Sequence, residues 1–93
     1  MSRDAATRRH FDRLSNLGCI ACLLLGRGET PAEIHHPRAF AGMGQRADDW
    51  LAIPLCPSDH RGAGGIHGDR TVLRQLRMDE AQLLAETLRR VYG

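Results

Sequence analysis

The chain has 93 residues, four of them aromatic, and a net charge of +2. One small domain of this length buries little core and commonly needs a metal ion or disulfides to stabilise it. The charged N-terminus gives no indication of a signal peptide, and no apolar run is long enough to cross a bilayer, so we expect a cytoplasmic protein with reduced cysteines and no membrane contact.

The predicted elements begin with a helix over residues 4–17, in which apolar side chains recur at helical spacing before Gly18 ends it. A tight turn over residues 19–22 follows. Residues 32–36 are bounded by prolines and predict a short strand whose end presents two adjacent histidines. Residues 38–49 are expected to form a loop.

A second strand is predicted over residues 50–55, at an edge because Pro54 has no amide hydrogen to donate. A glycine-rich turn then leads into a helical C-terminal third. Its first piece covers residues 69–77. Asp79 is expected to cap the second piece, with Gln82 as the reciprocal partner in a capping box.

The histidines and cysteines are clustered, which is the most informative feature of the sequence. Four of the five histidines and all three cysteines fall between positions 19 and 67. A lone histidine is usually a surface or core residue, but adjacent histidines downstream of a Cys-x-x-Cys turn are hard to explain by chance. The groups are Cys19 and Cys22, His35 and His36, and Cys56 with His60 and His67.

The cysteines predict a structural zinc site. Zinc takes four ligands in a tetrahedron, and Cys19 and Cys22 can point at one ion from a single turn. Cys56 would be the third ligand, and the fourth is either Asp59 or its neighbour His60. A redox role is less consistent with the pattern, because a helix rather than a strand precedes the motif.

The histidine pair predicts a second, catalytic metal site. A divalent ion can hold a scissile phosphate while a neutral imidazole activates water, and neighbouring histidines can divide these tasks. His60 could complete the metal site. His67 either joins it as a further ligand or hydrogen-bonds a phosphate or the next helix, and Glu33, two residues before His35, is a candidate to support a ligand.

Four motifs occur in a particular order: CIAC, EIHH, IPLCPSDHRG and GIH. This composite resembles the HNH (ββα-metal) nuclease superfamily, and within it the bacteriophage recombination-enhancement (Ref) group of RecA-dependent nucleases. The likeness covers about residues 17–93 and leaves the first helix largely outside. It implies an α+β fold in one nuclease domain over residues 1–93, with an N-terminal helix (1–17), a zinc-stabilised metal-binding core (18–68) and a helical tail (69–93).

The resemblance also implies residue roles. His36 matches the general base, His35 a metal-binding position, and His60 the metal-binding histidine at the start of the motif's helix. The three cysteines match structural zinc ligands, but Asp59 stands where relatives have cysteine or histidine. The asparagine of the HNH name is missing, and Asp49 could brace the loop in its place.

The function expected on these grounds is metal-dependent hydrolysis of DNA phosphodiester bonds, with structural Zn²⁺ and a catalytic Mg²⁺ or Mn²⁺. All thirteen basic residues are arginine, which suits phosphate contacts, although a GC-rich genome gives the same bias. The Ref likeness implies a link to recombination and to a RecA-type filament. The alternative is a zinc-stabilised nucleic-acid-binding module that cuts nothing. Arginines expected to contact DNA phosphates are Arg38, Arg46, Arg61 and Arg70.

Overall fold

The computed structural model describes residues 4–38 and 48–93, and Arg46 lies outside them. Helices and a two-stranded sheet form an α+β fold, as the sequence predicts. The described elements are α1 (Ala5–Leu17), α2 (Ile20–Leu24), β1 (Glu33–His35), the 3-10 helix η2 (Asp49–Leu51), β2 (Ile53–Leu55), α3 (Pro57–Arg61), α4 (Thr71–Leu76) and α5 (Glu80–Tyr92).

The long helices begin and end where the sequence predicts. The Asp4 side chain accepts a hydrogen bond from an amide in the first turn of α1, and Gly18 ends that helix at φ 83°. A Cβ at Gly18 would lie 2.8 Å from the carbonyl oxygen of Thr30, so the chain passes too closely there for any side chain. At the start of α5, Asp79 and Gln82 form the predicted capping box.

The two strands are shorter than predicted. They pair antiparallel, with His35 opposite Ile53. The predicted strand over residues 50–55 is wrong for its first part, because residues 49–51 form η2 instead. The Asp48 side chain accepts a hydrogen bond from the amide of Trp50 at 2.8 Å, which favours a turn over an extended strand at this point.

Two short helices, α2 and α3, differ from the predicted elements. Residue 19 caps α2, so the cysteine turn continues into a helix. Residues 57–61 form α3. Pro57 suits the first position of this helix, because an amide at that position makes no hydrogen bond within the helix and proline has none to lose. His60 lies in the last turn of α3 rather than at its start, where the resemblance placed it.

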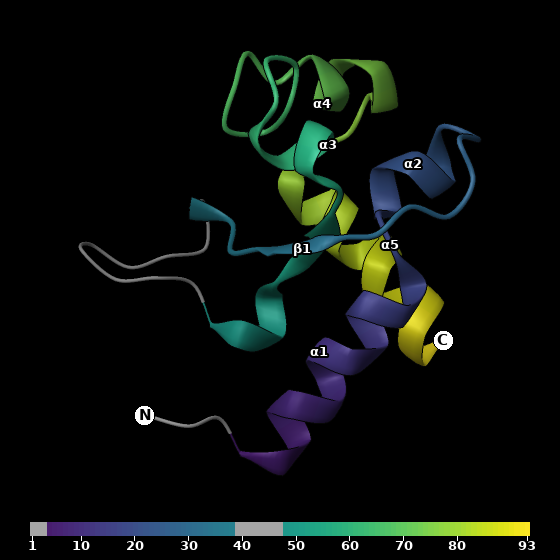
Figure 1. The fold of residues 1–93 in the computed structure, drawn as a ribbon, viewed down its shortest axis with the longest axis vertical. Coiled ribbons are helices and arrows are strands. Elements are labelled where there is room, and N and C mark those ends of the chain that lie inside the picture. The colour runs from purple at the N-terminus through teal and green to yellow at the C-terminus, as the bar shows by residue number, and fades with distance from the viewer. Residues whose placement is uncertain (1–3, 39–47) are drawn as a thin grey trace.

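The core lies where α5 meets the rest of the molecule. In Figure 1, β1 crosses the middle of the view, with α1 below it and α3 and α4 above. Helix α5 contacts α1, α2 and β2, and its Leu83 is completely buried with Ile20, Ile53 and Leu55. No helix in the described ranges is long and apolar enough to cross a membrane.

A buried histidine, not foreseen from the sequence, joins the two long helices. His10 in α1 is completely buried, and its Nδ1 lies 2.6 Å from the hydroxyl oxygen of Tyr92 at the end of α5. Its ring also stacks on Trp50 of η2, with centroids 4.3 Å apart. Burial, and secondly the positive charge of Arg13, lowers the pKa of His10 below its ordinary value of 6.5.

This shift predicts acid destabilisation through His10. Because the pKa of His10 is lower in the folded chain than in the unfolded chain, the unfolded state binds more protons as the pH falls below 6.5. We expect the free energy of unfolding in urea to fall between about pH 8 and pH 5, and to fall less in His10→Gln. Equal pH dependence in the two proteins would contradict this role.

Candidate functional site

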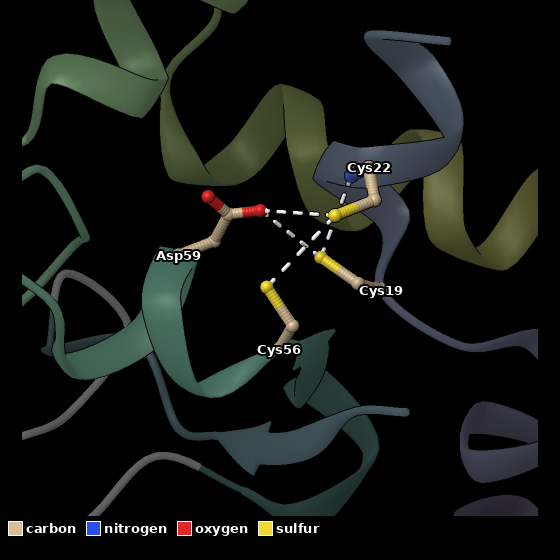
Figure 2. Close-up of side chains that lie close together, drawn as sticks. All are labelled: Cys19, Cys22, Cys56 and Asp59. Atoms are coloured by element: carbon tan, nitrogen blue, oxygen red, sulfur yellow. Dashed lines mark hydrogen bonds between the residues drawn. The ribbon is translucent and has the colours of Figure 1, made fainter. Parts of the chain in front are cut away.

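Three cysteines and an aspartate meet in one buried cluster, shown in Figure 2. One side-chain atom from each of Cys19, Cys22, Cys56 and Asp59 lies within 4.8 Å of the others, and all four residues are buried. A carboxylate oxygen of Asp59 lies 3.3 Å from the sulfur of Cys19 and 3.4 Å from that of Cys22. Three sulfurs and one oxygen around a common point are a ligand set that suits a tetrahedral zinc ion.

The four side chains come as two pairs, and the same arrangement at the start of a helix brings each pair together. Cys19 caps α2, and Cys22 is its third residue; Cys56 caps α3, and Asp59 is its third residue. Side chains at the cap and at the third helical position point to the same side, as the contact between the Cys22 amide and the Cys19 sulfur at 3.4 Å shows. His60 is one residue further, about 100° around the helix axis, and lies outside this cluster.

Burial and hydrogen bonds, including those from Arg27, set the ionisation of the cysteine cluster. Burial raises the pKa of the Cys19 thiol to about 12. Burial also raises the pKa of Asp59, but hydrogen bonds from thiols and from Arg27 outweigh it and hold the pKa below its ordinary value. The Arg27 guanidinium donates to the two Asp59 carboxylate oxygens at 3.1 and 3.3 Å. Without an ion, the carboxylate is therefore charged and partnered, and Cys19 keeps its proton.

A second cluster consists of His35, His60 and His67. Their ring centroids are 4.8 to 5.1 Å apart, and one nitrogen from each lies within 4.8 Å of the others. They come from β1, from α3 and from the loop between α3 and α4. Burial, and next the charge of His60, lowers the pKa of His67, which favours the neutral imidazole that a metal ion requires.

The hydrogen bonds of these imidazoles leave nitrogens available for an ion. His60 Nδ1 lies 2.9 Å from a Glu33 carboxylate oxygen, which can only accept, so Nδ1 carries the proton. The lone pair of His60 Nε2 then faces His67 Nε2 at 3.1 Å. His35 Nδ1 is buried without a hydrogen-bond partner among the described residues. An unpartnered nitrogen and a carboxylate-supported imidazole both fit a metal site.

A cavity of about 310 Å³ opens beside the histidine cluster. Arg38 and Arg70 line it together with His35, His67 and Glu80, so two of the arginines expected to contact DNA reach this cavity. A third, Arg61, does not line this cavity; it pairs with Glu33, which also contacts His60 of the histidine cluster.

Glu80 is a buried acid that sequence reasoning missed. Its carboxylate lies 3.4 Å from His35 Nε2 and accepts a hydrogen bond from Arg70 at 2.7 Å. The hydrogen bond with His35 lowers the pKa of Glu80, burial opposes this, and the charge of Arg70 adds to the lowering. An acid in the first turn of a helix ordinarily offsets the helix dipole, so the sequence carried no signal of this contact. Arg27 was also missed, because its contact with Asp59 spans 32 residues and no local pattern indicates it.

His36 points away from the histidine cluster to which its neighbour His35 belongs. Its Nε2 lies 2.8 Å from a carboxylate oxygen of Asp49 in η2, and its ring meets that of Phe11 edge-on at 6.3 Å. The adjacent His35 faces His60 and His67, as expected where alternate residues of an extended segment face opposite sides. The two histidines thus occupy different environments, and Asp49 contacts His36 directly.

A family model described as recombination enhancement, RecA-dependent nuclease matches residues 3–84. The chain belongs to this family. By its description, this is a family of RecA-dependent nucleases that act in recombination. The match includes α1 and ends within α5, so the expectation that the likeness leaves out the first helix and extends to residue 93 was wrong. No curated protein and no solved structure matches the chain.

The contacts of Glu80 predict a large difference between two glutamates of α5. Glu80→Ala leaves the buried His35 without a partner at either nitrogen among the residues that the structure describes, and we expect a loss of about 1–3 kcal/mol in the free energy of unfolding. Glu86→Ala removes an exposed pair with Arg89 and should cost about 0.5 kcal/mol or less. Urea unfolding measures both, and equal losses would contradict the assigned contacts.

Proposed function

We propose that this chain is a metal-dependent DNA endonuclease of the HNH (ββα-metal) type, and that His36 is its general base. One observation carries the proposal: a three-imidazole cluster lies at one side of β1, and a histidine–aspartate pair lies at the end of the same strand. The antiparallel strands followed by α3 give the order ββα, and the family is one of nucleases.

His36 has the hydrogen-bonding arrangement that a general base needs. If its Nε2 donates to the Asp49 carboxylate, the proton is fixed on that nitrogen and the lone pair remains on Nδ1. Nδ1 can then take a proton from a water molecule that attacks phosphorus. The partial exposure of the His36 side chain, 13%, leaves room for such a water. Asp49 holds the ring in place and stabilises it once it is protonated.

We assign a catalytic ion to His35, His60 and His67. When bound, the ion would stabilise the charge that develops on the phosphate and on the leaving oxygen. Glu33 and Glu80 orient two of these imidazoles through the hydrogen bonds described above. Of the two ions expected, Mn²⁺ fits the nitrogen ligands better than Mg²⁺, which prefers oxygen ligands and keeps much of its water.

We assign the structural zinc to Cys19, Cys22, Cys56 and Asp59. This ion would fix the start of α3 to the start of α2 and so hold His60 against β1. DNA phosphates would contact the exposed guanidinium groups of Arg38 and Arg70 at the cavity, and that of Arg61 beside Glu33. We include a RecA filament on DNA as the partner that the family's name implies.

The central test is the cleavage of plasmid DNA with added Mn²⁺, with and without a RecA filament. His36→Ala should lower the rate about a hundredfold or more, because the general base is lost. Its zinc and manganese contents should equal those of the parent, which would show that both metal sites survive. A His36→Ala protein that cuts as fast as the parent would refute the base assignment. A parent that binds DNA but never cuts it would favour the non-catalytic module.

The contact between Asp49 and His36 predicts a contrast between two neighbouring aspartates. Asp49→Ala frees the His36 ring and should slow cleavage about tenfold or more. Asp49→Asn should also slow it, because an amide does not stabilise the protonated imidazole and can donate to Nε2, which favours the wrong tautomer. Asp48→Ala is the matched control, because it removes the cap of the same turn without touching His36. If Asp48→Ala and Asp49→Ala were equally slow, the effect would come from the turn and not from the histidine.

A further inference from the structure

Two exposed aromatic side chains line one small hollow, away from the histidine cluster. Trp50 and Tyr92 are the large hydrophobic residues that stay exposed among those that the structure describes, at 42% and 49%. The hollow has a volume of about 120 Å³, and its other lining residues come from one face of α1. We call this surface the aromatic platform; it consists of Arg9, His10, Arg13, Trp50 and Tyr92.

The buried ring of His10 holds the platform rigid. Its plane is tilted by 18° from the indole of Trp50 and by 13° from the ring of Tyr92, so all three rings are nearly parallel. The hydrogen bond between His10 and the Tyr92 hydroxyl fixes the second ring. The aromatic side chains are therefore oriented before any ligand arrives, which lowers the entropy cost of binding.

The charge of the platform is positive. The lining residues include two arginines and no carboxylate. The Arg13 guanidinium lies 5.3 Å from the centre of the Tyr92 ring. Within residues 4–38 and 48–93, neither Arg9 nor Arg13 forms an ion pair, so both remain available for an anionic ligand.

The platform and the surroundings of His36 share two elements, α1 and η2. Trp50 directly follows Asp49, whose carboxylate contacts His36. Phe11 directly follows His10 in α1, and its ring meets the His36 ring edge-on. A ligand on the platform would therefore lie against α1 and η2, the same two elements that contact His36.

We propose that the aromatic platform binds an unpaired base of the DNA substrate by stacking, while Arg9 and Arg13 contact phosphates of the same strand. The proposal rests on the proposed function, because it takes DNA as the substrate. Every base has a flat π face, and aromatic side chains flanked by arginines bind single strands in this way without reading sequence. Bases within a duplex are already stacked on one another, so their faces cannot reach the platform.

A protein partner fits the platform less well. Stable protein interfaces bury about 800 Å² on each side and centre on a broad apolar patch. Here the large hydrophobic residues classed as exposed within the described ranges are two side chains around one small hollow. A hollow of this size, with positive charge at its edge, matches one base and its flanking phosphates.

The test uses the intrinsic fluorescence of Trp50, the one tryptophan of the chain. Binding is measured in the His36→Ala protein without added Mn²⁺, so that the DNA stays intact whether or not His36 is the general base. We expect a short oligothymidylate to quench the emission, and a duplex of the same length to leave it nearly unchanged. With a labelled oligonucleotide, Trp50→Ala should lower the affinity for the single strand about tenfold and change the duplex affinity less than twofold. Trp50→Phe keeps a ring and should restore most of the loss.

Three outcomes would overturn the proposal. The first is single-strand binding that Trp50→Ala leaves unchanged. The second is an equal loss of single-strand and duplex affinity, which would make the platform a general DNA contact. The third is unchanged DNA binding with weakened binding to a RecA filament, which would make it a protein-docking surface. These outcomes do not depend on cleavage, so failure of the general-base assignment would leave the binding result standing.

Discussion

The convergence of two helix starts is the constraint on which the rest of the structure depends. Residues at the cap and third position of α2 and of α3 bring three thiols and one carboxylate to a single buried point (Figure 2). A chain of this length has little apolar surface to hold α3 in place otherwise. The position of α3 then decides where His60 lies, and so whether three imidazoles can meet. An ion at the cysteine cluster would therefore act on the proposed catalytic site through the placement of one short helix.

Buried imidazoles need partners, and acidic side chains from different elements supply them. Glu33 on β1 supports His60, Glu80 on α5 contacts His35, and Asp49 on η2 contacts His36. Each carboxylate fixes one nitrogen and leaves the other for chemistry. In the proposed mechanism, this arrangement would separate metal binding at His35 from proton transfer at His36, the residue that follows β1. Arg61 and Arg70 pair with the first two acids, and Arg70 also lines the cavity.

Helix α1 joins the platform to the proposed active site. Its Phe11 contacts His36, while His10, one residue earlier, anchors η2 and the end of α5. The family match also begins at residue 3, so α1 belongs to the part of the chain that the family shares. In the proposed mechanism, the helix connects the binding of an unpaired strand with the position of the general base.

The sequence alone determined the features that depend on near neighbours. The caps of α1 and α5 follow from residues three or four positions apart. The spacing of the cysteines and histidines predicted that the three cysteines meet and that His35 meets His60, and it left the fourth member of the first cluster and the place of His67 open. The family also emerged from motif order. The local prediction failed at residues 50–51, where the side-chain cap of Asp48 favoured a 3-10 helix over a strand. The helix that the resemblance started at His60 begins at Pro57.

Only the tertiary structure decided which residues from distant segments meet. It placed Asp59 rather than His60 at the cysteines, because residues one position apart on a helix face directions about 100° apart. It also brought Arg27 to Asp59, Glu80 to His35 and His10 to Tyr92, across 32, 45 and 82 residues. No local pattern encodes such contacts, because each depends on how whole helices pack around the shared core.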